Sequence, residues 1–131
     1  RGARLAKSPM PMRLMYTLVM RREPTNPVVI INKLRSATLD GKLLWERTGE
    51  YGSQYRVVLD ELHTATIARV PAGNAVVFTM TSAEGKPILH LDSGRVDDDV
   101  LKLALLQLYV TVRDTVAALL VEEAAKTLDG L

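Results

Sequence analysis

The sequence predicts one small α+β domain: a short N-terminal helix, an antiparallel β-meander of four to five strands, and a long C-terminal helix packed on one face of the sheet. Three observations support this. The chain has 131 residues, 47% of them hydrophobic, which is enough for one buried core. Its middle part shows short alternating segments separated by tight turns. Its last third shows a continuous helical pattern rich in aliphatic residues.

The first helix is expected from Pro27 to Asp40. Asn26 is a favourable N-cap, Pro27 fits the first helical turn, and Gly41 supplies a C-terminal stop. Five strands are expected after it, at residues 43–48, 55–60, 63–70, 75–81 and 86–92. Because the turns between them are short, these strands are expected to pair antiparallel as a meander.

The last helix is expected over residues 97–127, with three consecutive aspartates at its start, where carboxylates favour the helix dipole. It would be about 45 Å long, longer than the meander is wide, so part of it should overhang or kink. From Val100 to Val121 most residues are hydrophobic, and the few polar ones do not gather in one arc of the helix. Such a helix needs burial on more than one side.

This surplus of apolar surface is the main functional clue in the sequence. It predicts a non-enzymatic protein-interaction module that self-associates, as a symmetric homodimer, or binds a permanent protein partner. The alternative is a monomer whose two helices and N-terminal segment bury all the apolar surface. The residues expected at the interface are Leu101, Leu105, Leu108, Tyr109, Val112, Val116 and Leu119.

Positive charge is concentrated at the start of the chain. The segment 1–22 holds six Lys or Arg and no acid, whereas the rest holds eleven Lys or Arg against fifteen Asp or Glu. We therefore divide the chain into a basic, partly ordered extension at residues 1–24 and a single domain at 25–131. A second hypothesis is a nucleic-acid-associated protein that uses the basic arm, with Arg13, Arg21 and Arg22 as contacts.

Localisation and membrane association have weaker signals. The chain has no cysteine, which excludes disulfides and thiolate zinc sites and fits a cytoplasmic protein. No transmembrane segment is expected, because the longest uncharged run in the last helix, Leu103 to Val112, is far shorter than about 20 residues.

No catalytic residue, metal site or cofactor is predicted. His63 and His90 lie on expected strands, and as neighbours they could bind a metal or act in acid–base chemistry with nearby acids, but solvent-facing strand histidines are the simpler interpretation. A small-molecule binder or enzyme with a cleft between sheet and helices is a third hypothesis, because sites assembled from distant residues leave no sequence motif.

The only tryptophan, Trp45, has two interpretations. It can cap the sheet beside the first helix. Alternatively, an exposed Trp45 with Tyr51 and Tyr55 would form a recognition patch, since Trp and Tyr are frequent at binding hot spots.

Three runs within residues 26–59 also form a pattern. They are Ile31-Asn32-Lys33-Leu34, Gly41-Lys42-Leu43-Leu44-Trp45-Glu46 and Tyr55-Arg56. This pattern resembles one in small uncharacterised bacterial and phage proteins, in which a short helix meets a Gly-Lys-Leu-x-Trp strand and then a meander. The resemblance implies a bacterial origin and carries over no activity and no catalytic residue.

Overall fold

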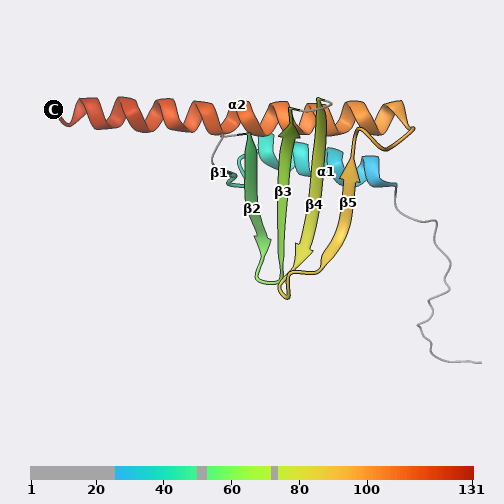
Figure 1. Ribbon diagram of the computed structural model, residues 1–131. Helices are drawn as coiled ribbons and strands as arrows, with labels where there is room; N and C mark the ends of the chain where they lie inside the picture. Colours follow the sequence, from blue (N-terminus) through green and yellow to red (C-terminus); the bar gives the residue numbers. More distant parts are fainter. Residues whose placement is uncertain (1–25, 50–52, 72–73) are drawn as a thin grey trace, which may run out of the picture.

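The computed structural model describes residues 26–49, 53–71 and 74–131, and its elements follow the predicted order (Figure 1). The elements are α1 (Pro27–Leu39), β1 (Glu46–Thr48), β2 (Gln54–Asp60), β3 (His63–Val70), β4 (Ala75–Ser82), β5 (Pro87–Asp92) and α2 (Asp99–Asp129). The strands form one antiparallel sheet in the order β1-β2-β3-β4-β5. The predicted α+β class is therefore confirmed.

Local sequence signals set both ends of α1. The side chain of Asn26 accepts a hydrogen bond from the Val28 N–H at 2.9 Å, as an N-cap residue should. At the other end, Gly41 has a φ of +77°, and the Lys42 N–H donates to the Ala37 carbonyl at 2.9 Å. This is a Schellman turn, which needs a left-handed residue and so favours glycine.

The expected first strand is shorter than the sequence indicated, because only Glu46–Thr48 pairs with β2. The side chain of Trp45 is turned into the core, where its Nε1 donates a hydrogen bond to Thr38 Oγ1 of α1 at 2.9 Å. The segment before β1 is thus tied to the helix rather than to the sheet.

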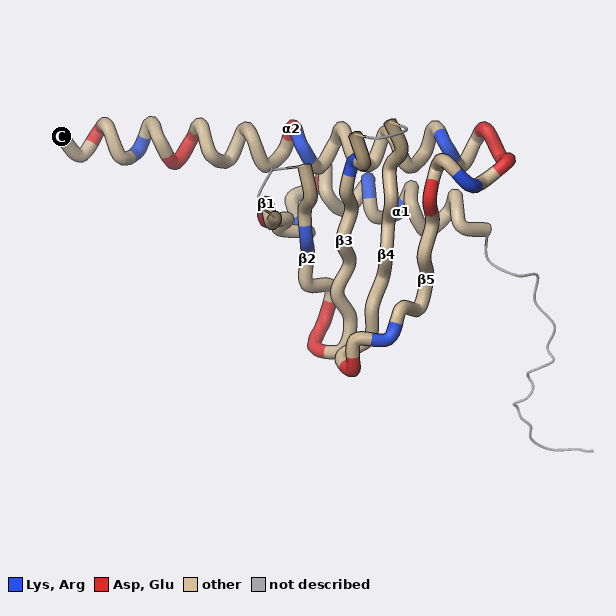
Figure 2. The backbone as a smooth tube through the Cα atoms, in the orientation of Figure 1, with Lys and Arg blue, Asp and Glu red and all other residues tan. Residues whose placement is uncertain are grey.

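The two faces of the sheet differ in burial. Along β2, β3 and β4, buried and less buried residues alternate, as expected for a sheet covered on one side. One row across the covered face is buried in four neighbouring strands: Tyr55, Ile67, Phe78 and Leu91. The adjacent row on the open face is polar: Arg56, Thr66, Thr79 and His90. Figure 2 shows few charged residues along the middle of the strands.

The helix α2 runs across the strands near one end of the sheet, with α1 beside it and in the same direction (Figure 1). Asp98 caps it, accepting hydrogen bonds from the Val100 and Leu101 N–H groups, which confirms the expected role of the aspartates at its start. Its first half supplies core residues, including Leu105 and Leu108, which are fully buried.

Candidate interaction surface on the C-terminal helix

The second half of α2 projects beyond the domain (Figure 1). Val116 is the last buried residue of the helix, and each of residues 117–131 is exposed. We call the segment 117–131 the overhang; at a rise of about 1.5 Å per residue it is about 22 Å long. The sequence-based expectation that part of this helix overhangs the sheet is confirmed.

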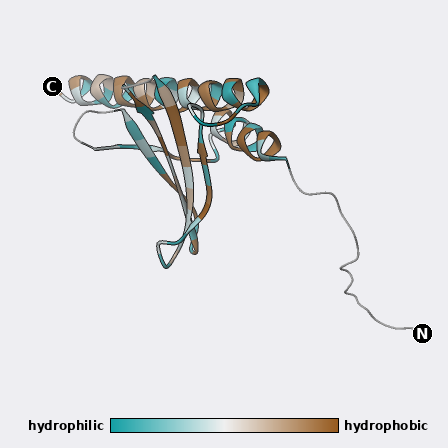
Figure 3. Cartoon of the chain, turned by 45° about the vertical axis from the view of Figure 1, so that its right-hand side comes forward, coloured by the Kyte–Doolittle hydropathy of each residue, from teal (hydrophilic) through white to brown (hydrophobic). Residues whose placement is uncertain are grey.

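The overhang carries a large amount of apolar surface. Leu120, Val121 and Leu128 are 45%, 69% and 66% exposed, respectively. Figure 3 shows hydrophobic residues along α2 as far as its C-terminal part. A helix as short as the overhang is only marginally stable in water without tertiary contacts, because most helical stability in proteins comes from packing of an apolar face. The overhang, which continues the packed first half of α2, has no buried residue to provide such packing.

The apolar surface forms one line along the whole helix. At about 100° per residue, the buried residues of α2 occupy an arc of about 160°. Directly opposite lies an arc of about 60° in which every residue after Asp99, at the helix start, is apolar. We call it the outer stripe, and its members are Leu103, Leu106, Val110, Ala117, Val121, Ala124 and Leu128. All but the half-buried Val110 are exposed.

Polar residues change sides between the two halves of α2. The four charged residues of the overhang, Glu122, Glu123, Lys126 and Asp129, fall within one arc of about 120°. This arc continues the face that is buried in the first half of the helix. Beyond the sheet that face is therefore mostly polar, although Leu119 also lies on it. The largest apolar part of the overhang is the continuation of the outer stripe.

One ion pair flanks the outer stripe at its middle. Arg113 Nε lies 3.1 Å from Asp114 Oδ1, and the two side chains are 51% and 64% exposed. Because the two residues are adjacent in sequence, their side chains leave the helix about 100° apart, one on each side of the stripe.

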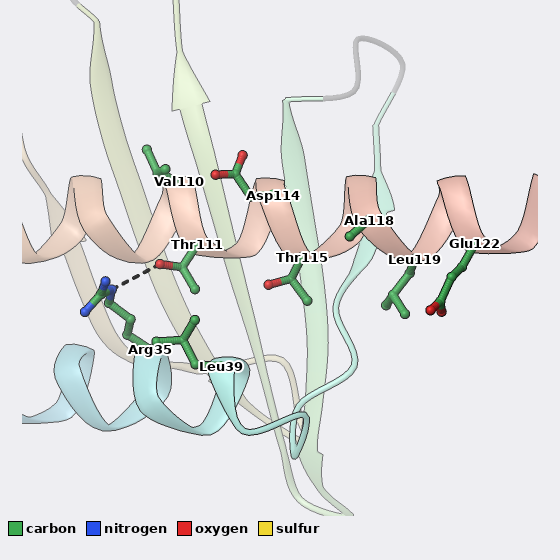
Figure 4. A pocket seen from close by; sticks show the side chains of 9 residues that line it. All are labelled: Arg35, Leu39, Val110, Thr111, Asp114, Thr115, Ala118, Leu119 and Glu122. Carbon is green, nitrogen blue, oxygen red and sulfur yellow. Dashed lines mark hydrogen bonds between the residues drawn. The ribbon is translucent and has the colours of Figure 1, made fainter.

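A groove between the helices lies beside this surface (Figure 4). It has a volume of about 560 Å³ and is lined by Arg35 and Leu39 of α1 and by residues of α2 from Val110 to Glu122. The side chains of Arg35 and Thr111 point toward one another, and Arg35 Nε donates a hydrogen bond to Thr111 Oγ1 at 3.1 Å. Neither histidine lines the groove, so it lacks the usual group for acid–base chemistry at neutral pH.

The structure places most of the predicted interface residues in the core of the chain itself. Six of the seven are buried there: Leu101, Leu105, Leu108, Tyr109, Val112 and Val116. They pack against the sheet and α1 and are not available to a partner in this structure. Leu119, 46% exposed, is the one member that lies on the free surface.

The recognition patch that the sequence suggested is not exposed. Trp45 and Tyr55 are only 4% and 2% exposed, because both belong to the core of the domain. The ring of Tyr55 packs edge-on against Tyr109, with centroids 6.0 Å apart, and burial raises the pKa of the Tyr109 hydroxyl. Tyr51 lies outside the described residues. The first interpretation of Trp45, a cap beside the first helix, agrees with its hydrogen bond to Thr38.

The two histidines are not brought together. His63 stands at the start of β3, where it pairs with Ser82, whereas His90 pairs with Thr79 and accepts from or donates to its hydroxyl at 2.9 Å. Strand β4 separates them. Within the part of the chain that the structure describes, no group of three or more His, Cys, Asp or Glu residues could hold a metal ion.

His63 instead belongs to a local cluster in the β2–β3 hairpin. The Leu62 N–H donates to Asp60 Oδ1 at 2.7 Å, and His63 Nδ1 lies 2.9 Å from the same oxygen. Both contacts hold the pKa of the Asp60 carboxyl below its ordinary value, and the hydrogen bond from the Leu62 backbone has the larger effect. A lowered carboxyl pKa stabilises the folded state above about pH 4, and this stabilisation is lost as the pH falls through the folded-state pKa.

Replacing His63 with alanine should raise the pKa of Asp60 only part of the way to its ordinary value, because the Leu62 backbone hydrogen bond remains. Carbon-13 NMR titration of the side-chain carboxyl would measure the shift. The His90→Ala variant is the control and should leave the pKa of Asp60 unchanged. An unchanged value in His63→Ala would show that the imidazole does not influence this carboxylate.

The predicted nucleic-acid arm, with Arg13, Arg21 and Arg22, lies outside the described residues, as does the whole of the proposed extension at 1–24. For the membrane expectation, the structure adds one observation. By length and composition alone, α2 is long and apolar enough to cross a bilayer. However, the face from Leu101 to Val116 is buried against the rest of the domain.

Comparison of the sequence with known protein families, with curated proteins and with solved structures finds no match. The functional assignment therefore depends on the surface described above.

Proposed function

We propose that this chain is a non-enzymatic protein-interaction module that binds another protein chain through the outer stripe of α2. The observation that carries the proposal is the overhang, the end of a helix in which no residue is buried. Its apolar side chains include Val121 and Leu128, both largely exposed. Contiguous apolar surface of this kind on a folded domain is typical of an interaction site.

The charges of the overhang favour a protein over a lipid surface as its partner. Helices that lie on membranes carry Lys and Arg on their polar face, which attract anionic lipids. The polar face of the overhang instead carries three acids and a single lysine, Lys126. An anionic bilayer would repel this face, whereas an apolar helix of a protein partner only requires the outer stripe.

The geometry of the stripe also suits a helical partner. Its residues recur mostly at spacings of three and four, with Leu103, Val110, Ala117 and Ala124 at intervals of seven. This spacing keeps the stripe facing a second helix over several turns. The groove beside α1 offers a second, more polar contact region next to Val110.

Site-specific photo-crosslinking in cells that make the protein would test this function. A photoreactive amino acid at Val121, on the outer stripe, should give one discrete adduct with a protein. The same group at Lys126, on the polar face of the same helix, should not give it. The adduct should also disappear when Leu128→Asp places a charge in the stripe. If Val121 gives no adduct, or gives one that Leu128→Asp does not affect, the outer stripe is not a binding surface.

A further inference from the structure

One edge of the sheet is open at β5. In the part of the chain that the structure describes, β5 is the last strand and has a neighbour, β4, on one side only. The Ser93 N–H donates to the Val76 carbonyl at 2.9 Å, and residue pairs that exchange hydrogen bonds alternate along two antiparallel strands. Leu91 therefore turns its N–H and C=O toward β4, whereas His90 and the N–H of Asp92 turn outward. These outward groups are the template that an added strand would pair with.

The side chains at this edge also leave apolar surface for a neighbouring strand. Leu91 is buried under the helices, but Leu89 on the same face of β5 is only half-buried. Ile88, near the start of the strand, is 54% exposed. Between Pro87 and Asp92, β5 carries no Lys or Arg, the residues that often protect a free edge from pairing. The edge therefore suits a strand with apolar side chains.

The chain itself contains a segment with the sequence of such a strand. Residues 13–20 include no Gly, Pro or acid, and large apolar side chains occupy every second position. These side chains are Leu14, Tyr16, Leu18 and Met20. In a strand all four would lie on one face. The segment lies outside the described residues, so this pattern comes from the sequence alone.

We propose that residues 13–20 pair with the free edge of β5 as a sixth strand, parallel to β5. The direction follows from the place where α1 begins, which is beyond the β5 side of the sheet and near the level of the β5 end closest to α2 (Figures 1 and 3). A parallel strand ends at that level. Residues 21–25 then only have to cross from the sheet to Asn26, and they can span up to about 20 Å. An antiparallel strand would end a whole strand length further away.

The charges at this corner of the domain favour the same direction. Between the end of β5 and the first turn of α2, residues 92–102 hold four aspartates and only two cations, Arg95 and Lys102 (Figure 2). In the parallel arrangement, Arg21 and Arg22 directly follow the added strand and reach this corner, where they balance the excess negative charge. An antiparallel strand would bring only Arg13 there.

Faces and charges together select one register. With Met20 beside Leu91, the large apolar side chains of the segment face the helices, and Arg21 lies beside Asp92. In a parallel pair, a residue bonds to the positions before and after the one beside it. The Met20 N–H then donates to the outward carbonyl of His90. The His90 N–H donates to the carbonyl two residues before Met20.

This inference goes beyond the proposed function and does not depend on it, because β5 and the outer stripe are separate surfaces. It extends the domain to about residue 13 and gives the basic segment a role within the domain. Arg21 and Arg22 would then neutralise aspartates of their own chain, which leaves them less available for nucleic acid. Failure of the tests below would leave the outer stripe and its photo-crosslinking test unaffected.

Amide hydrogen exchange, measured by NMR on the full chain, tests the pairing. The His90 N–H should exchange at least about 100-fold more slowly than in the unfolded chain. Met20→Pro should remove this protection, because proline has no N–H and its ring fills the position of the bond. Val19→Pro is the matched control, since the N–H of Val19 points away from β5 in a parallel strand, where proline is tolerated. The Leu91 N–H should stay protected in all three proteins, which shows that the sheet is intact.

Three results would overturn this inference. The first is a His90 N–H that is unprotected in the full chain, or that stays protected in both proline variants. The second is loss of protection in Val19→Pro alone, because in an antiparallel strand Val19 would turn its N–H toward β5. The third is protection that increases with protein concentration, which would mean that a second copy covers the edge.

The absence of cysteine allows a second test that does not depend on exchange rates. Val19→Cys and His90→Cys in one chain place two thiols beside each other on the open face, with Cα atoms about 5 Å apart, as a disulfide requires. Mild oxidation should give an intramolecular disulfide in a chain of unchanged mass class. Met15→Cys with His90→Cys is the control and should not react, because Met15 lies about 13 Å further along the strand. Equal reaction of both pairs, or a disulfide that links two chains, would overturn the proposed strand.

Discussion

Replacing Leu108 with alanine should lower the free energy of unfolding by about 2–5 kcal/mol. Leu108 is fully buried in the first half of α2 and belongs to the same core cluster as Leu105 and Val112. The substitution removes three carbon atoms from a packed interior and leaves a cavity that the rigid neighbours fill only in part. Urea denaturation of the full chain would measure the change through the midpoint at constant slope.

Leu106 offers a matched control two residues earlier, on the opposite side of the same helix. It is the same residue type, but it lies on the outer stripe and is 48% exposed. At low protein concentration, where association does not contribute, Leu106→Ala should cost less than about 1 kcal/mol. In the photo-crosslinking test, by contrast, Leu106→Ala should weaken the Val121 adduct, because it removes apolar surface from the outer stripe, whereas Leu108→Ala should not weaken it while the chain stays folded. Equal losses of stability would contradict the assignment of the two faces.

The fold was predictable because each element carries a local signal that agrees with its packing. Asn26 and Gly41 mark the two ends of α1, and the alternation around Val57 marks a strand with one buried face. The structure bears out these expectations. The shortened first strand was not predictable, because the hydrogen bond from Trp45 to Thr38 joins residues whose proximity depends on the tertiary fold.

The proposed interaction surface was only partly predictable from the sequence. The sequence shows that α2 has too much apolar surface for one contact, but residue spacing alone does not say which face the domain covers. The expected interface therefore fell on Leu108 and Val112, which the structure buries. The available signal was the position of the overhang charges. Glu122 and Lys126 lie on the same face of the helix as Leu108. Because charged side chains stay in water, the helix must extend beyond the core at residues 122–126.

Thr38→Val should destabilise the domain by about 1–3 kcal/mol, although it nearly preserves the volume of the side chain. Thr38 is 2% exposed, and its hydroxyl donates to the Leu34 carbonyl at 2.7 Å and accepts a hydrogen bond from Trp45 Nε1 at 2.9 Å. Valine leaves the indole N–H of a buried tryptophan without its acceptor. The unmatched buried donor then costs more than the hydrogen bond itself contributes to stability.

A double-mutant cycle with Trp45→Phe would isolate this interaction. Phenylalanine removes the indole N–H, so Thr38→Val should cost less in a Trp45→Phe background than in the original chain. Thr38→Ser keeps the hydroxyl and loses only a methyl group, so its cost should stay near about 1 kcal/mol and should depend little on residue 45. A cycle with no coupling would mean that the contact between α1 and the segment before β1 is held by packing alone. In that case, the hydrogen bond would not be the reason why residues 43–45, before β1, do not pair with β2.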